Sequence, residues 1–132
     1  MKLPLLLSIL LASIMTLSAA EVPKITPAEA AQRVKDGKAV LVDVREPSEW
    51  AETGVAAPAV LLPMSDLQGE RKLWQPFLDQ NAGKEILLYC RSGNRSGKVA
   101  AKLAQEGKTV ANVGGFKEWT DAGLPTRKVE TP

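Results

Sequence analysis

One cysteine, Cys90, carries most of the chemistry that this sequence could perform. It is the only cysteine among 132 residues, and Arg91 and Arg95 follow it closely. A thiol next to cationic side chains is easily deprotonated, and the thiolate is a strong nucleophile. The alternative is that a free cysteine is simply a small buried hydrophobic residue. We take Cys90 as a candidate nucleophile.

The chain contains no histidine, which narrows the chemistry open to Cys90. A Ser-His-Asp or Cys-His hydrolase needs an imidazole base, and a zinc site needs several His or Cys ligands. Both classes are excluded, and we expect neither a metal nor a cofactor. The surroundings of Cys90 must therefore activate its thiol.

The residues after Cys90 are small, polar or basic, and they predict a tight loop that leads into a helix. The loop residues are Arg91, Ser92, Gly93, Asn94, Arg95 and Ser96. Successive backbone N–H groups at the start of a helix, together with the positive end of its dipole, form a nest that stabilises an anion. Gly93 allows the backbone to curl tightly. This nest would favour a thiolate, a bound anionic substrate and a persulfide on Cys90.

A phosphate-binding loop is the first alternative for this stretch. The segment from Gly93 to Val99 partly matches the pattern G-x-x-x-x-G-K-[ST]. Its two glycines are one residue too close, and Val99 has no hydroxyl group for magnesium. A P-loop is therefore excluded.

Strands and helices alternate along the chain and place Cys90 at the end of a strand. We expect strands over residues 39–44, 60–62, 85–89 and 109–113, and helices over 26–36, from 47 onward, over 72–80, 95–106 and 116–122, with Gly114-Gly115 as a tight turn. Continuous apolar runs are typical of strands buried on both faces of a sheet. The pattern predicts an α/β fold with a mainly parallel central sheet, helices on both faces, and a site at the carboxyl ends of the strands.

Residues 1–20 have the composition of a secretory signal peptide. Lys2 precedes an apolar run from Leu3 to Leu17, and Ser18-Ala19-Ala20 is a small-residue cleavage site. The run is shorter than the roughly 20 residues that span a bilayer, so we expect cleavage, no stable membrane insertion and a periplasmic or secreted protein. Residues 21–132 would then form one domain.

Loss of the leader lowers the formal net charge from +2 to +1, and so small a charge gives no reason to expect nucleic-acid binding.

Three segments of the chain resemble the rhodanese family of sulfurtransferases. The loop from Cys90 to Ser96 is similar to the active-site loop of that family. The stretch LVDVREPSEW, residues 41–50, resembles its first signature, and VGGFKEW, residues 113–119, with the following Gly123-Leu124-Pro125 resembles its C-terminal one. The segments occur in the family's order. The resemblance implies a single rhodanese-like domain with its active site at Cys90.

The resemblance also implies a ping-pong transfer of sulfur. Cys90 would take the outer sulfur of thiosulfate or a related donor as a persulfide and pass it to cyanide or a thiol. The amides of the loop would hold this sulfur, and Arg91 and Arg95 would attract the dianionic donor, as in thiosulfate rather than mercaptopyruvate enzymes. Asp43 and Arg45 match a pair that supports the loop structurally.

Two other functions remain open on the same fold. Related phosphatases and arsenate reductases carry an arginine six positions after the cysteine, whereas here Arg95 comes at five and Ser96 at six. This smaller loop suits a sulfur atom. A non-catalytic rhodanese-like binding module would not need Cys90, and an idle exposed thiol is a liability outside the cytoplasm. The sequence departs from the family at residues 53–59, TGVAAPA, where many members have Gly-His-Ile-x-Gly-Ala.

Overall fold

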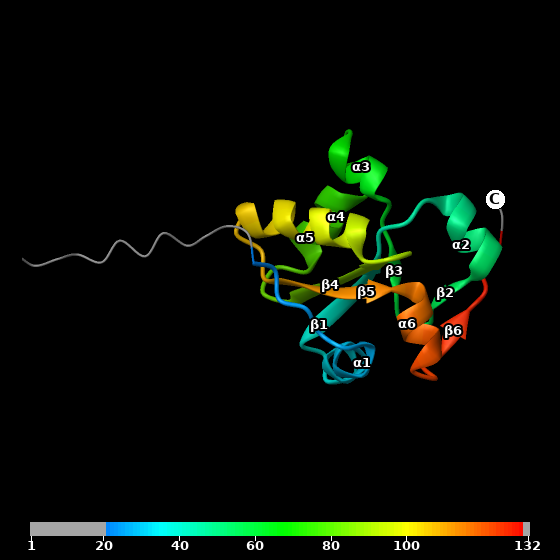
Figure 1. Cartoon of the computed structure of the whole chain (residues 1–132). Coiled ribbons are helices and arrows are strands. Elements are labelled where there is room, and N and C mark those ends of the chain that lie inside the picture. Colours follow the sequence, from blue (N-terminus) through cyan, green and yellow to red (C-terminus); the bar gives the residue numbers. More distant parts are fainter. Residues whose placement is uncertain (1–20, 131–132) are drawn as a thin grey trace, which may run out of the picture.

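Four apolar segments pair in parallel into one sheet with the strand order β3-β1-β4-β5 (Figure 1). In the computed structural model, which describes residues 21–130, β1 spans Ala39–Asp43, β3 Val60–Leu61, β4 Glu85–Cys90 and β5 Val110–Gly115. Since every pairing in this sheet is parallel, the carboxyl ends of its strands meet at one edge. Cys90 lies at that edge, and the predicted mainly parallel sheet is confirmed.

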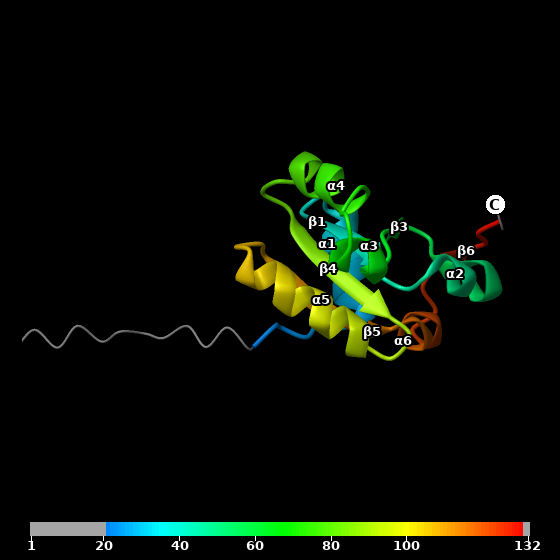
Figure 2. The ribbon, with the colours of Figure 1, turned by 90° about the horizontal axis from the view of Figure 1, so that it is seen from above.

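Helices cover both faces of the sheet. They are α1 (Pro27–Lys35), α2 (Pro47–Thr53), α3 (Met64–Gln68), α4 (Trp74–Gln80), α5 (Asn94–Gln105) and α6 (Phe116–Asp121). Figures 1 and 2 show α3, α4 and α5 on one face and α1 and α6 on the other. Helix α2 lies beyond the carboxyl edge, next to a small antiparallel sheet of β2 (Val55–Ala56) and β6 (Thr126–Arg127). The helices on both faces agree with the predicted fold class.

Alternate residues of β4 point to opposite faces of the sheet, and this divides the core into two parts. Ile86, Leu88 and Cys90 pack into the cluster that α3, α4 and α5 complete. Leu87 and Tyr89 pack into the cluster that includes α1 and α6. The sulfur of Cys90 therefore faces the α5 side, while the preceding Tyr89 faces the α6 side.

The expected tight turn at Gly114-Gly115 is wrong. Both glycines extend β5 and pair with Tyr89 and Cys90, after a register shift that begins past Leu88. A bulge of this kind inserts one extra residue into a strand without ending it. A Cβ atom on Gly115 would lie 2.4 Å from the carbonyl oxygen of Arg91. The glycine therefore permits the loop after Cys90 to pack against β5.

Helix α4 begins at Trp74, two residues later than expected. The carboxylate of Asp66 accepts hydrogen bonds from the backbone N–H groups of Lys72, Leu73 and Trp74 at 2.9–3.0 Å. These bonds satisfy donors that no helical carbonyl can reach. Pro76 then falls in the first turn, where its missing N–H group is tolerated.

No helix within residues 21–130 is long and apolar enough to cross a membrane. The expected signal peptide, residues 1–20, lies outside the residues that the structure describes. Its cleavage and the expected domain boundary at residue 21 stay predictions.

Candidate active site

Strand β4 ends at Cys90, and a short loop leads from it into α5. Gly93 makes the turn with a φ of 95°, a left-handed conformation that glycine adopts without steric cost. Helix α5 begins directly afterwards and has 12 residues. The side chain of Cys90 is fully buried, at 0% exposure. Its sulfur therefore lies under the loop, at the positive end of a helix dipole.

The sulfur of Cys90 accepts hydrogen bonds from the loop. The backbone N–H of Gly93 donates to Sγ at 3.0 Å, and the hydroxyl oxygen of Ser96 lies 3.4 Å from Sγ. Burial raises the pKa of the Cys90 thiol, but hydrogen bonds from the Ser96 hydroxyl and from the amides of Ser96, Ser92 and Gly93 outweigh it. The pKa therefore lies below its ordinary value, because these donors stabilise the thiolate.

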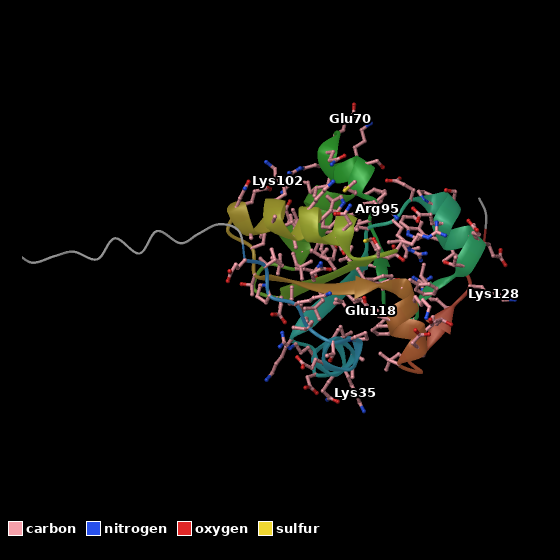
Figure 3. All side chains as sticks on the ribbon, viewed as in Figure 1. Lys35, Glu70, Arg95, Lys102, Glu118 and Lys128 are labelled. Atoms are coloured by element: carbon pink, nitrogen blue, oxygen red, sulfur yellow. The ribbon has the colours of Figure 1, made fainter. Side chains whose placement is uncertain are left out.

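The two loop arginines have different surroundings. Arg95 forms a two-pronged ion pair with Glu49 of α2, at 2.6 and 2.8 Å, which lowers the pKa of Glu49 to about 2. Figure 3 shows Arg95 on α5, near α2. Arg91 is exposed and has no ion pair within residues 21–130. The negative charge of a Cys90 thiolate is among the causes that raise the pKa of Arg95, after its pairing with Glu49. The expected activation of the thiol by both arginine charges stays a prediction.

Some groups of the other predicted loop residues face the sulfur of Cys90, and others are exposed to solvent. The amides of Ser92 and Gly93 face Sγ, and the Ser96 side chain is fully buried against it. The side chains of Ser92 and Asn94 are exposed, and Asn94 is the first residue of α5. Within the described range, no group of three or more His, Cys, Asp or Glu side chains could hold a metal ion.

Asn112 of β5, which the sequence analysis did not single out, ties the loop to the neighbouring strand. Its Oδ1 accepts hydrogen bonds from the Ser96 hydroxyl at 2.8 Å and from the N–H of Gly114 at 3.0 Å. Its Nδ2 donates to the carbonyl oxygen of Gly93 at 3.0 Å. Since a hydroxyl has one proton, Ser96 donates either to Asn112 or to Cys90. The only sequence signal for this residue is a polar amide inside an apolar strand.

Asp43 and Arg45 form a buried ion pair near the same edge of the sheet. The guanidinium donates to both carboxylate oxygens at 2.8–3.1 Å, and the two residues are 0% and 1% exposed. Arg45 also donates to the Thr53 hydroxyl and to the carbonyl oxygen of Gly54, and it lies 4.7 Å from the ring centroid of Phe116. The pair thus fixes the end of α2 and the start of α6, and its support of the catalytic loop stays a prediction.

A cavity of about 330 Å³ opens beside the loop, between α2 and α6. It is lined by Arg45, Glu49, Glu52, Thr53, Arg91, Phe116, Lys117 and Thr120. Cys90 pairs with Gly115 in the sheet, so the residues that follow them, Arg91 and Phe116, leave the same edge. A smaller cavity of about 170 Å³ lies between α3 and α5. The larger one borders the loop through Arg91, and Cys90, whose side chain packs on the α5 side, does not line it.

Known proteins resemble this chain over most of the described residues. The family model for the Rhodanese-like domain matches residues 26–122. The putative sulfurtransferase YtwF of Bacillus subtilis is 36% identical over 107 residues, which cover 80% of this chain and 97% of that protein. A sulfurtransferase of Allochromatium vinosum is 36% identical over 97 residues, 71% of this chain and 84% of its own.

A solved structure also matches the fold of this chain. The crystal structure of a rhodanese-related protein from Thermoplasma volcanium matches with a TM-score of 0.65 at 27% identity, over 80% of this chain and 97% of that one.

Two further relatives by sequence, uncharacterized proteins of Synechocystis sp. and Bacillus subtilis, are 36% and 38% identical to this chain. The matched region spans only 56% and 61% of their lengths.

Proposed function

The chain belongs to the rhodanese-like domain family, and we propose that it is a sulfurtransferase in which Cys90 carries the transferred sulfur as a persulfide. The observation that supports this most is the set of backbone donors around Sγ: the N–H of Gly93 donates to it at 3.0 Å, and the amides of Ser92 and Ser96 also stabilise the thiolate. Donors fixed around a sulfur stabilise a thiolate, and equally the negative charge of a persulfide. Two relatives whose names include sulfurtransferase give further support.

In the first half-reaction, we propose that the Cys90 thiolate attacks the outer sulfur of thiosulfate. A bond forms between Sγ and this sulfur, the original sulfur–sulfur bond of thiosulfate breaks, and its electron pair leaves with sulfite. The enzyme then holds a persulfide anion on Cys90. No proton is transferred in this step, so a chain without histidine can carry it out.

In the second half-reaction, cyanide or a thiolate attacks the terminal sulfur of the persulfide. The bond between that sulfur and Sγ breaks, and its electron pair restores the Cys90 thiolate. The product is thiocyanate or the persulfide of the acceptor. The two half-reactions share one covalent intermediate and need no external oxidant or reductant.

An intact-protein mass spectrum tests this function. Incubation with thiosulfate should add the mass of one sulfur atom, and cyanide should remove it and release thiocyanate. Cys90→Ser should show neither change, because a hydroxyl is far less acidic than a thiol. No mass increase at any pH would contradict the proposal and favour a binding module. Hydrolysis of an aryl phosphate that requires Cys90 would favour a phosphatase.

We also propose that residues 1–20 direct export and are then removed. The basic start, the apolar run and the small-residue site support this proposal. Protein recovered from the periplasm or the medium of its native host should begin at about Glu21. A protein found there with Met1, or found only in the cytoplasm, would contradict it.

A further inference from the structure

We propose that the N-terminal segment, residues 22–25, positions the loop after Cys90 by acting through Asn112 of β5. The inference rests on the proposed role of Cys90 as the nucleophile. It adds to the site a positioning element that lies outside the loop and outside the four-stranded sheet.

The N-terminal segment adds a short parallel pairing to the outer edge of β5. Lys24 forms a bridge with Asn112. The N–H of Asn112 donates to the carbonyl oxygen of Pro23 at 2.9 Å, and the N–H of Ile25 donates to the carbonyl oxygen of Asn112 at 3.1 Å. Figure 1 shows the segment in blue, where it leads into α1. Both backbone polar groups of Asn112 are therefore bonded to this segment.

Two side chains anchor the N-terminal segment to the core. Ile25 is buried in the cluster that includes Tyr89, on the side of α1 and α6. Val22 packs against the other cluster, which contains Cys90. Residues three positions apart in an extended chain point to opposite faces of a sheet, so the segment is held on both faces. The position of the Asn112 backbone is fixed with it.

The support of the segment falls where the ladder between β4 and β5 is interrupted. Leu88 pairs with Asn112, but Tyr89 pairs with Gly114, so Val113 is the extra residue of the bulge. A bulge locally disrupts a ladder and bends its strand. The N-terminal segment therefore holds the backbone of Asn112 from the outer edge, next to the point at which the pairing with β4 is disrupted.

The side chain of Asn112 connects this backbone to the loop. A Cβ atom on Gly97 would lie 3.3 Å from Nδ2, so α5 packs directly on the amide. Nδ2 donates to the carbonyl oxygen of Gly93, and Oδ1 accepts from the hydroxyl of Ser96. The N–H of Gly93 and the hydroxyl of Ser96 in turn face Sγ. Hydrogen bonds weaken steeply when their geometry is lost, so a displaced Asn112 would loosen donors that stabilise the thiolate.

The charged groups near Cys90 belong to other elements. Arg95 of α5 pairs with Glu49 of α2, and Arg91, which follows the cysteine in the loop, is exposed. The core cluster around Cys90 consists of apolar side chains. The one charged residue of the N-terminal segment, Lys24, is exposed. The segment therefore acts on the pKa of Cys90 through hydrogen bonds rather than through charge.

The pH dependence of alkylation by iodoacetamide, measured on the full chain, tests the inference. Cys90 is the only cysteine, so the rate reports its thiolate alone. Ile25→Pro removes the N–H that donates to Asn112. The pH of half-maximal alkylation should move upward by about half a unit, and the rate below that pH should fall about threefold, the lower end of what one hydrogen bond contributes.

Lys24→Pro is the matched control, because it removes an N–H that donates no hydrogen bond within residues 21–130. It introduces the same rigid ring one position earlier, at an exposed residue. The half-maximal pH should stay at the wild-type value. A shift equal to that of Ile25→Pro would show that a rigid segment, and not the lost bond to Asn112, changes the sulfur, and the inference would be wrong.

A second background shows whether Asn112 carries the effect. Asn112→Ala removes the amide that ties the loop to β5 and should itself raise the half-maximal pH. In that background Ile25→Pro should cause no further shift, because the segment then has no side chain through which to act. An additive shift would mean that the segment acts by another route, such as the packing of Ile25, and would overturn the inference.

Val22→Ser is the milder variant, because it weakens one anchor of the segment and leaves every backbone donor in place. It should lower the alkylation rate by about twofold, in the same direction as Ile25→Pro and only when Asn112 is present. It decides the question if urea denaturation shows that Ile25→Pro does not fold. Folded variants with a wild-type pH profile would contradict the inference. Alkylation needs no sulfur donor, so this outcome is separate from whether thiosulfate forms a persulfide.

Discussion

Two groups at the carboxyl edge of one sheet hold negative charge in different ways. The carboxylate of Asp43 is compensated by the guanidinium of Arg45, which donates three hydrogen bonds to it. The sulfur of Cys90 has no cationic hydrogen-bond partner within residues 21–130, and neutral donors of the loop stabilise it. A charge that is paired with an opposite charge is fixed in place. Neutral donors such as amides can stabilise negative charge both on Sγ in the thiolate and on the terminal sulfur of a persulfide.

The fold separates these two groups by the alternation of a strand. Tyr89, whose ring lies beneath Arg45, faces α6, and the next residue, Cys90, faces α5. The ion pair and the sulfur can therefore be substituted one at a time. In each of the following experiments one residue near these groups is substituted, and the stability of the protein or the reactivity of Cys90 is measured.

The largest effect is expected from breaking the buried ion pair. Arg45→Met leaves the fully buried carboxylate of Asp43 without its partner, and the loss of one member of such a pair costs about 3–5 kcal/mol. Urea denaturation at pH 7 should show this loss in the free energy of unfolding. If the pair also supports the loop, as the family resemblance implies, iodoacetamide should alkylate Cys90 at a different rate in the folded variant. An unchanged rate would limit the role of the pair to stability.

A double variant provides the control for this prediction. Asp43→Leu combined with Arg45→Met removes both charges, and an apolar replacement of a buried pair is often neutral. It should recover part of the lost stability. A loss of less than about 1 kcal/mol in Arg45→Met, the value of a surface ion pair, would mean that the pair does not stabilise this edge.

The next effect concerns the sulfur. Ser96→Ala removes the hydroxyl that lies 3.4 Å from Sγ, and with it part of what lowers the pKa of Cys90. The thiolate fraction at pH 7 should fall, so alkylation by iodoacetamide should be about fivefold slower. The pH at which alkylation reaches half its maximal rate should move upward.

Ser92→Ala is the matched control, since its exposed hydroxyl makes no hydrogen bond in the structure of residues 21–130 while its amide remains. Alkylation should proceed at the wild-type rate. Equal rates for Ser96→Ala and wild type would show that the amides alone activate the thiol.

How much of this could be predicted from the sequence depends on how local each feature is. Strand β4 was predictable because its apolar residues form a continuous run, and the observed strand ends one residue beyond the expected 85–89. The extension of β5 through Gly114-Gly115 was not predictable. Two consecutive glycines indicate a turn unless a backbone segment distant in sequence packs against them. Here the carbonyl of Arg91 does so.

The same distinction applies to the site. The nest of amides after Cys90 follows from a strand, a glycine and a helix start within a few residues. The bond from Ser96 to Asn112 joins residues 16 positions apart, and the pair of Glu49 with Arg95 joins residues 46 positions apart. Such contacts depend on which strands become neighbours. For this reason the pairing of Arg95 with Glu49 was not foreseen and Asn112 was missed.

A smaller effect is expected from Asn112. In Asn112→Asp, a carboxylate competes more strongly for the Ser96 proton and adds negative charge near Sγ, so the pKa of Cys90 should rise. Alkylation at pH 7 should be about threefold slower. Asn94→Asp adds the same charge at the exposed start of α5, away from that hydroxyl, and should have less effect. If both variants slow alkylation equally, the added charge alone explains the change and competition for the Ser96 proton does not.

The smallest effect should come from Glu49, which compensates the loop arginine. Glu49→Gln keeps a hydrogen-bond acceptor for Arg95 but leaves its positive charge unpaired. Persulfide formation from thiosulfate, a dianion, should become about twofold faster at low ionic strength, and the gain should vanish in high salt. Alkylation by neutral iodoacetamide should not change. Faster alkylation would show instead that the arginine charge does activate the sulfur, and the contrast between a paired carboxylate and an amide-held thiolate would no longer hold.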